Sequence, residues 1–470
     1  MYKSAFVSVK LKKSKFIRSL ITFMVFLLCA FMIIIVSCRM LDDGVENGAT
    51  REESGGASEG EGDDTENGEK LDVAITLWDC LDPKGRLALM DTIDDFMVEN
   101  SHVEIETEHF RSQEELEDRF EAASLAGAGP EIILLDFDGL QRLVPGIVVK
   151  EITGETVSGI DYSLFLDGLV EISEYNGRNY IVPFRSSDFM VFYYNKDIVE
   201  EPPYEFEEVI EYCKEANIPG ENIYGFLLNS NDADWIIPFI GGYGDWVVDY
   251  GYGSLTLDNE ATVKTMEFLD YIYNEEKILP SNIEYEEING LFKSGSAHMI
   301  IDNISQLGEY EGADIRVGVA KIPRVWQGSR NPTPLISGLG FMVNVNCYGN
   351  ELEAAGSLIG YMLDEEVQAE WTLRTDTFPA LISMDGNDIF AGDELKYEAF
   401  QQAKICRGRP YEKIIMAIRN ALRDNALGVI SQDILPADAA VKIQEDALRL
   451  RSGSISVEEE AETGETNENQ

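Results

Sequence analysis

Residues 113–137 read QEELEDRFEAASLAGAGPEIILLDF. Residues 113–125 have the composition and spacing of an amphipathic helix, and the Gly-Ala-Gly-Pro run at 127–130 is a stop signal for that helix. Residues 131–137 then form an almost unbroken apolar run, which is typical of a parallel strand buried on both faces. A helix, a short turn and a buried strand in succession predict an α/β fold.

The same alternation continues on both sides of this stretch. Residues 71–78 (LDVAITLW) predict a first strand and 103–108 a half-buried strand, with an amphipathic helix at 86–100 between them. The second half of the chain predicts longer helices with strands among them: helices at 262–276, 351–373, 393–405 and 411–425, and strands at 297–302, 315–320 and 339–345. About 380 residues between 71 and 451 suffice for two or three domains.

The N-terminus has the composition of an export signal. Six cationic residues and no acid precede an apolar run that ends in Ile35-Val36-Ser37-Cys38. This pattern resembles the lipobox of bacterial lipoproteins, which implies that residues 1–37 are a signal peptide and that Cys38 carries a lipid. We therefore expect the protein on the extracytoplasmic face of the cell membrane. An uncleaved anchor is the alternative, because residues 20–37 as a helix would span about 27 Å, close to the thickness of the bilayer core.

Acidic residues dominate the remaining chain. Residues 1–37 hold six of the 37 Lys and Arg residues, so 31 remain against 86 Asp and Glu. Such a surface repels nucleic acid, and we predict no nucleic-acid partner, although a cationic or metal-bearing ligand stays open. Residues 38–70 combine acids and glycines without an aromatic residue and predict a disordered tether. Residues 452–470 predict a disordered acidic tail.

The cysteines do not predict a metal site. Four of them remain in the body of the chain, far apart and without a Cys-x-x-Cys spacing: Cys80, Cys213, Cys347 and Cys406. Buried free thiols are the expected state, and one long-range disulfide stays open.

Seven short segments between residues 71 and 451 are informative because of their order along the chain. These segments are 125–135 (LAGAGPEIILL), 182–199 (VPFRSSDFMVFYYNKDIV), 238–270, 291–301 (LFKSGSAHMII), 317–324 (VGVAKIPR), 337–344 (SGLGFMVN) and 354–379. In this order they resemble family 1 of the extracellular solute-binding proteins of ABC importers, the maltose-binding-protein-like group. The chain departs from the family pattern at Asp302-Asn303, where many sugar-binding relatives have glycine and then an aromatic residue.

The resemblance implies two α/β lobes of the type II periplasmic-binding-protein-like fold, joined by hinge crossovers. Lobe 1 would comprise residues 71–184 and 303–346, and lobe 2 residues 189–298 and 350–451. Hinges would lie at 185–188, 298–303 and 344–349. Open α/β sheets bind ligands beyond the carboxyl ends of their strands, so the ligand is expected between the lobes, which close by hinge motion.

A sugar site needs aromatic platforms together with directional polar groups. Tryptophans near the expected cleft and polar groups at strand ends or crossovers meet this description, and packing, helix capping or a hinge salt bridge are their structural alternatives. The predicted ligand contacts are Trp78, Asp79, Asp136, Arg185, Trp235, Asp245, Trp246, Asp302 and Trp326, together with Ser337, Gly338 and Tyr411, which the resemblance places near the cleft.

Motifs of enzyme chemistry are missing from the sequence. The three histidines, His102, His109 and His298, have no metal-ligand spacing, and no Gly-x-Ser-x-Gly, His-Glu-x-x-His or P-loop pattern occurs. We predict a monomeric binding protein without metal or cofactor. It would capture a sugar or oligosaccharide and deliver it to ABC permease subunits. The alternatives are a surface protein for a non-sugar solute or for signalling or adhesion and, last, a secreted hydrolase.

Overall fold

The computed structural model describes residues 72–464, with side chains up to 453, and all of these belong to one compact unit of the chain. The predicted signal peptide, Cys38 and the tether at 38–70 lie outside the described residues. Within 72–464, no helix is both long and apolar enough to cross a membrane.

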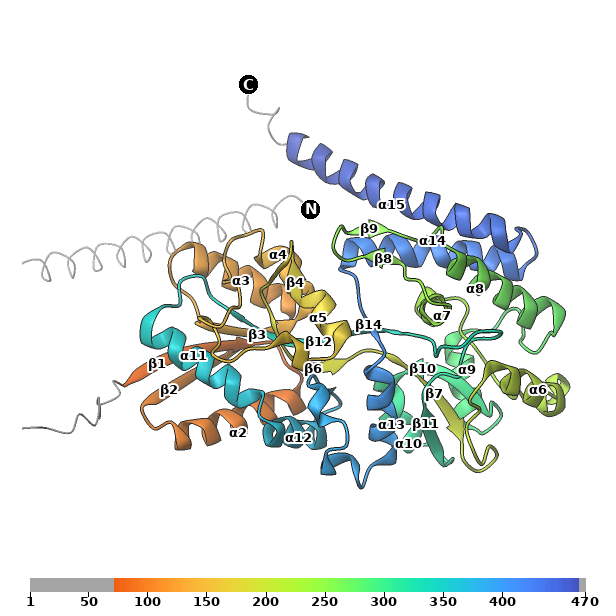
Figure 1. Cartoon of the computed structure of the whole chain (residues 1–470), viewed down its shortest axis with the longest axis horizontal. Helices are drawn as coiled ribbons and strands as arrows, with labels where there is room; N and C mark the ends of the chain where they lie inside the picture. The colour runs from red at the N-terminus through yellow and green to blue at the C-terminus, as the bar shows by residue number, and fades with distance from the viewer. Residues whose placement is uncertain (1–71, 465–470) are drawn as a thin grey trace, which may run out of the picture. The chain divides into compact units, whose positions relative to one another are not determined.

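The first sheet has seven strands. Its order is β13 (Phe378–Pro379), β6 (Val182–Ser187), β12 (Leu335–Val343), β3 (Ile132–Asp136), β1 (Val73–Asp79) and β2 (Val103–His109), and β14 (Arg407–Gly408) pairs with β12. Strand β1 runs parallel to β2 and β3, whereas β12 runs antiparallel to β3 and β6. Around this sheet lie α2 (Pro83–Glu99), α3 (Gln113–Leu125), α11 (Gly349–Met362) and α12 (Glu365–Arg374) (Figure 1).

The second sheet has three antiparallel strands in the order β10 (Met299–Asn303), β7 (Met190–Asn195) and β11 (Val317–Ala320). Its lobe contains α6 (Phe206–Ala216), α7 (Ile237–Gly242), α8 (Glu260–Asp270), α9 (Tyr285–Lys293), α10 (Leu307–Glu311), α13 (Glu394–Ala403), α14 (Glu412–Ile430) and α15 (Pro436–Gly464) (Figure 1). Helix α13 packs on β11, and α14 packs against α15 and α8.

Shorter elements lie near the junction of the lobes. They are α4 (Leu140–Leu143), α5 (Asp167–Ser173), the hairpin of β4 (Glu174–Tyr175) and β5 (Arg178–Asn179), and the hairpin of β8 (Val248–Asp249) and β9 (Ser254–Leu255). Helix α5 packs against β14, so it connects the first lobe to the segment that leads into α14.

The quoted stretch at 113–137 folds as its sequence predicts. Ser112 caps α3 through a hydrogen bond that its Oγ accepts from the Glu115 amide (3.2 Å). Gly127 and Gly129 after the helix have φ angles of +74° and +104°, a left-handed conformation that glycine adopts without strain. The chain thereby turns directly into β3, whose first four residues are buried.

Strand pairing corrects the predicted lobe boundaries. Strand β11 pairs with β7, so residues 303–320 belong with the second sheet and not, as predicted, with lobe 1. Helix α11 packs on β1, so its residues belong with the first sheet and not with lobe 2. The chain therefore crosses between the sheets at 188–189 and at 321–334. After β13 it enters the second lobe with α13, returns to the first sheet with β14 and crosses again before α14. The predicted hinges at 298–303 and 344–349 lie inside the lobes.

Two predicted elements also differ in extent. The helix expected at 351–373 is divided at Leu363-Asp364, where the Asp364 carboxylate accepts the Glu366 amide (2.8 Å) and caps α12. Helix α15 continues to Gly464, although we predicted a disordered tail from 452. The run of glutamate and alanine after 457 has good helix propensity, which accounts for the continuation. All four cysteines of the described residues are free thiols.

Candidate functional site

Strand β3 delivers Asp136 to the carboxyl edge of the first sheet. Its Oδ1 accepts the Asp138 amide (3.0 Å), and its Oδ2 accepts the Ser337 hydroxyl of β12 (3.3 Å). Burial raises the pKa of the Asp136 carboxyl to about 6, although the nearby Arg409 acts in the opposite direction. Asp136 therefore combines the predicted capping role with a position at the sheet edge that faces the other lobe.

Arg409 joins three carboxylates from two parts of the fold, the end of β3 and the β6–β7 crossover. Its Nη2 donates to Asp138 Oδ2 (2.7 Å) and lies 3.6 Å from Asp136 Oδ1, and its Nη1 donates to Asp188 Oδ2 (2.9 Å). Asp188 lies in the β6–β7 crossover with a left-handed φ of 58°, and it accepts Asn303 Nδ2 at the end of β10 (2.8 Å). This Arg409 cluster links the edges of both sheets through one guanidinium.

A cavity of about 530 Å³, the cleft pocket, opens next to the Arg409 cluster. The first lobe supplies residues 137–141 and the β4–β5 hairpin, and the second lobe supplies the β8–β9 hairpin and the start of α14. Four tyrosines line it: Tyr175, Tyr250, Tyr252 and Tyr411. The volume is in the range of small-molecule sites, and tyrosine rings beside charged and amide groups fit a ligand with apolar faces and many hydroxyls.

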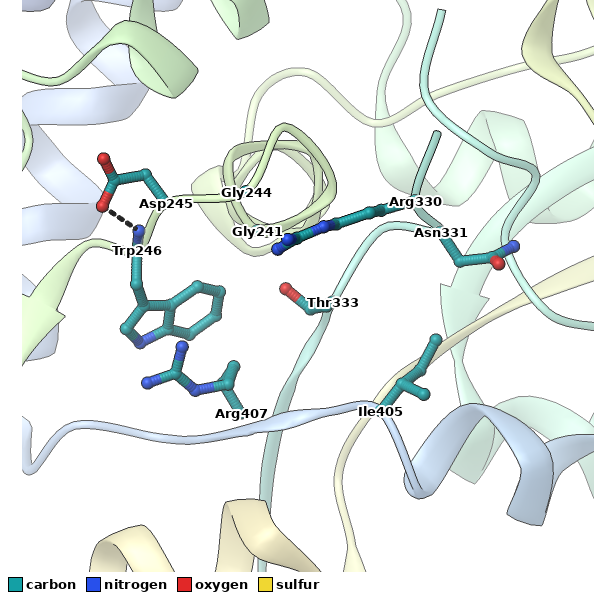
Figure 2. A pocket seen from close by; sticks show the side chains of 9 residues that line it. All are labelled: Gly241, Gly244, Asp245, Trp246, Arg330, Asn331, Thr333, Ile405 and Arg407. Atoms are coloured by element: carbon teal, nitrogen blue, oxygen red, sulfur yellow. Dashed lines mark hydrogen bonds between the residues drawn. The ribbon is translucent and has the colours of Figure 1, made fainter. Parts of the chain in front are cut away.

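A second cavity, the hinge pocket, also has a volume of about 530 Å³ (Figure 2). It is lined by the end of α7 and the following loop, by the crossover segment 330–333 and by Ile405 and Arg407. Asp245 and Trp246, both predicted as ligand contacts, lie here and not in the cleft pocket. Trp246 is 4% exposed, and its Nε1 donates to the Tyr250 hydroxyl (3.1 Å).

Of the other predicted contacts, three lie at the cleft. Asp136 and Ser337 contact each other, and Tyr411 lines the cleft pocket. Gly338, next to Ser337, lies where β12 passes close to β6: a Cβ there would be 1.9 Å from the Arg185 carbonyl oxygen. Its role in the structure is close strand packing.

Arg185, which we predicted as a ligand contact, makes its hydrogen bonds inside the first lobe. Its side chain is fully buried, and it donates to the hydroxyls of Thr372 (2.7 Å) and Thr377 (3.0 Å) and to the carbonyl of Gln368 (3.0 Å). Burial lowers the pKa of its guanidinium to about 9. The predicted hinge salt bridge is also absent, because its partners within the described residues are hydroxyls and carbonyls. Strand β6 places this side chain against α12, away from the cleft.

Asp79 and Trp78 are held inside the first lobe. Asp79 is fully buried between Arg86, with which it forms an ion pair, and His109, whose Nδ1 is 2.8 Å from Asp79 Oδ1. Trp78 packs on Phe110 with ring centroids 4.9 Å apart. The Asp79 carboxylate is therefore already paired inside the lobe, whereas we predicted that it contacts the ligand.

The remaining predicted residues lie in the second lobe. Trp235 Nε1 donates to the Ile301 carbonyl (2.6 Å), and Asp302 accepts the hydroxyls of Tyr310 (2.5 Å) and Tyr285 (3.2 Å). Both predicted residues are buried, so these contacts stabilise the lobe. Trp326 stacks on Tyr271 with centroids 4.3 Å apart, beyond the end of α8, and lines neither pocket.

Several residues of the site were missing from the predicted set. Asp188, predicted only as a hinge residue, joins the interlobe cluster, and Tyr175, Tyr250 and Tyr252 line the cleft pocket. Tyr252 is 87% exposed and sits between Gly251 and Gly253 at the tip of a hairpin, a pattern that could have indicated a presented aromatic residue. Within residues 72–453, no group of His, Cys, Asp and Glu is arranged to hold a metal ion.

Residues 91–396 match the sequence model of the bacterial extracellular solute-binding proteins. The chain belongs to this family. This solute-binding protein is 24% identical over 260 residues to the maltotriose-binding protein of Pyrococcus abyssi, which covers 55% of the chain and 56% of that relative. The match thus spans little more than half of the relative's length. It is also 23% identical over 297 residues to the galactooligosaccharide-binding protein of Bacillus subtilis, covering 61% and 68%.

Solved structures confirm the two-lobed fold. The extracellular solute-binding protein of Staphylococcus aureus in complex with maltose superposes with a TM-score of 0.70 at 18% identity, covering 81% of this chain and 98% of that one. Membership of a family of binding proteins also confirms the prediction that the chain is not an enzyme.

Proposed function

We propose that this solute-binding protein captures a sugar or oligosaccharide in the cleft pocket and delivers it to the permease of an ABC importer. The observation that carries the proposal is the cleft pocket itself: tyrosines from both lobes line a cavity that Arg409 and Asp138 of the Arg409 cluster also line. Relatives named for binding maltotriose and galactooligosaccharide support a carbohydrate as the ligand class. Charged and amide groups that can bond hydroxyls, together with tyrosine rings, suit a pyranose ring.

A thermal-shift screen against a carbohydrate panel tests the ligand class. A ligand that binds the folded state alone raises the melting temperature in proportion to RT ln(1 + [L]/Kd), so a true ligand gives a concentration-dependent shift. We expect shifts with neutral sugars or oligosaccharides. If peptides, polyamines or metal ions give shifts and no sugar does, the proposed ligand class is wrong.

Tyr252 and Tyr204 make a matched pair for locating the site. Both tyrosines are exposed in the second lobe, at 87% and 60%, but only Tyr252 lines the cleft pocket. Loss of an aromatic platform costs about 0.5–1.5 kcal/mol, so Tyr252→Ala should weaken sugar binding by about two- to tenfold in calorimetric titrations. Tyr204→Ala should bind like the wild type. Equal affinities of the two variants would place the ligand elsewhere.

Export and anchoring are the second part of the proposal. We infer from Ile35-Val36-Ser37-Cys38 that the mature protein is held by lipid on Cys38 at the outer face of the cell membrane. Cys38→Ser should either release the protein into the medium or leave it uncleaved, as seen by fractionation and by the mass of the N-terminal peptide. Unchanged processing and membrane retention would favour the anchor helix instead.

A further inference from the structure

The hinge pocket is separate from the cleft pocket. The two cavities share no lining residue, and a layer of side chains divides them. In this layer the Arg407 guanidinium lies over the rings of Trp246 (4.9 Å) and Tyr250 (5.7 Å), and its Nε donates to Glu171 (2.6 Å). The hinge pocket is therefore a candidate site of its own.

Two guanidinium groups border this cavity. Figure 2 shows Arg330 and Arg407 on opposite sides of the Thr333 side chain. Arg330 is exposed and forms no ion pair within residues 72–453. In a chain with 86 acidic and 37 basic residues, two arginines at one cavity run against the overall charge. Because Arg407 is paired with Glu171, Arg330 carries the positive charge that is unpaired within the described residues, and Arg407 offers the Nη groups of its guanidinium, which together suit an oxyanion.

Thr333 supplies an uncharged donor between the two arginines. Its Oγ1 is enclosed and has no hydrogen-bond partner in the described part of the chain. An unsatisfied enclosed hydroxyl is costly, and a ligand oxygen would remove this cost. Gly241 gives the hydroxyl its space, because a Cβ at that position would lie 1.5 Å from Thr333 Oγ1.

We propose that the hinge pocket binds a small oxyanion of phosphate or carboxylate chemistry between Arg330 and Arg407. The Thr333 hydroxyl, which the structure encloses against Gly241, would turn towards the ligand and donate a third hydrogen bond. Asp245 lies at the rim and opposes the anion electrostatically, but Figure 2 shows its carboxylate turned away from Arg407, bonded to the Trp246 amide (3.0 Å). The site is independent of the sugar proposed for the cleft pocket.

Inorganic phosphate and malonate are the probes, measured by calorimetric titration and thermal shift on the full-length protein. Potassium chloride at equal ionic strength is the control, because any salt screens the repulsion within a chain of formal charge −49. We expect phosphate or malonate to raise the melting temperature more than chloride does. A larger shift with phosphate indicates a phosphate ligand, and a larger shift with malonate indicates a carboxylate ligand. Equal shifts with all three salts would overturn the proposal.

Three variants test the geometry without any sugar. Arg330→Gln removes one charge-assisted contact and should weaken anion binding about tenfold or more. Asp245→Asn removes the opposing charge and should strengthen binding severalfold. Arg119→Gln, at another exposed arginine that has no ion pair within residues 72–453, should leave binding unchanged. The proposal is wrong if Arg330→Gln and Arg119→Gln bind the probe equally well.

Discussion

At the scale of single residues, burial decides which predicted groups are free to bind. Asp302 shows this clearly, because its carboxylate is 1% exposed and already accepts two tyrosine hydroxyls and the Asn303 amide (2.8 Å). Burial raises the pKa of this carboxyl to about 6, and the hydrogen bonds only partly compensate. The contribution of Asp302 to the stability of its lobe therefore depends on pH.

The pH dependence of stability follows from the direction of this shift. The folded state holds the Asp302 proton up to about pH 6, whereas an unfolded aspartate loses it near its ordinary pKa. The contribution is therefore fully present below about pH 4 and is lost as the pH rises through 6, and it amounts to about 2–3 kcal/mol. Chemical denaturation between pH 4 and 7 should show this loss in the wild type and a flatter profile in Asp302→Asn.

Asp314→Asn is the matched control for this measurement. Asp314 lies in the same lobe, but its side chain is exposed. Its variant should keep the wild-type pH profile, so a profile flattened equally by both substitutions would contradict the assignment to Asp302.

The sequence predicts that Trp235, Trp246 and Asp302 lie near the cleft, but it does not show that their side chains are buried. Trp235 is held by the Ile301 carbonyl, 66 residues away, whereas Trp246 and Asp302 bond to tyrosine hydroxyls only four and eight residues further along the chain. The sequence does not show which of these side chains turn inward, because that depends on the fold of the whole lobe. Asp136 was placed at the cleft because a strand end is a local feature that the sequence shows directly, whereas Tyr411 was placed there by the resemblance to the solute-binding family.

At the scale of elements, Arg185 explains how β6 is fixed to its neighbours. Its guanidinium reaches α12 through Gln368 and Thr372 and the start of β13 through the Thr377 carbonyl (2.9 Å). These partners are more than 180 residues away in the sequence. One side chain thus joins an early strand to a late helix at the first crossover.

Arg185→Met should destabilise the first lobe without abolishing the cleft. Methionine keeps most of the apolar stem, but the carbonyls and hydroxyls around the guanidinium lose their donors, at an expected cost of about 2–4 kcal/mol in the free energy of unfolding. Denaturant titration measures this loss. A substitution at an exposed arginine, Arg111→Met, should change stability by less than about 0.5 kcal/mol. Similar values for the two variants would contradict the structural role of Arg185.

Elements were predicted more successfully than their partners. The turn after α3 and the buried strand β3 are encoded locally, by two glycines with positive φ and by an apolar run. The lobe assignment of residues 303–320 was wrong because it depends on the pairing of β11 with β7, more than 100 residues earlier. Local periodicity identifies a strand but not the sheet that it joins.

At the scale of the whole molecule, the Arg409 cluster is a side-chain connection between the lobes. Asp138 belongs to the edge of the first sheet, Asp188 to a crossover, and Asn303 to the edge of the second sheet. Arg409 neutralises carboxylates that would otherwise repel one another across the cleft. We therefore expect this guanidinium to favour the approach of the two lobes.

Arg409→Gln should shift the protein towards a more open arrangement. Without the guanidinium, Asp136, Asp138 and Asp188 face one another without a cation among them, and their repulsion is strongest at low ionic strength. Small-angle scattering of the ligand-free variant at low salt should give a larger radius of gyration than the wild type, and added potassium chloride should reduce the difference. Arg409→Lys keeps the charge but loses the forked geometry, so it should fall between the two. If scattering of Arg409→Gln matches the wild type at every salt concentration, the cluster does not control the distance between the lobes.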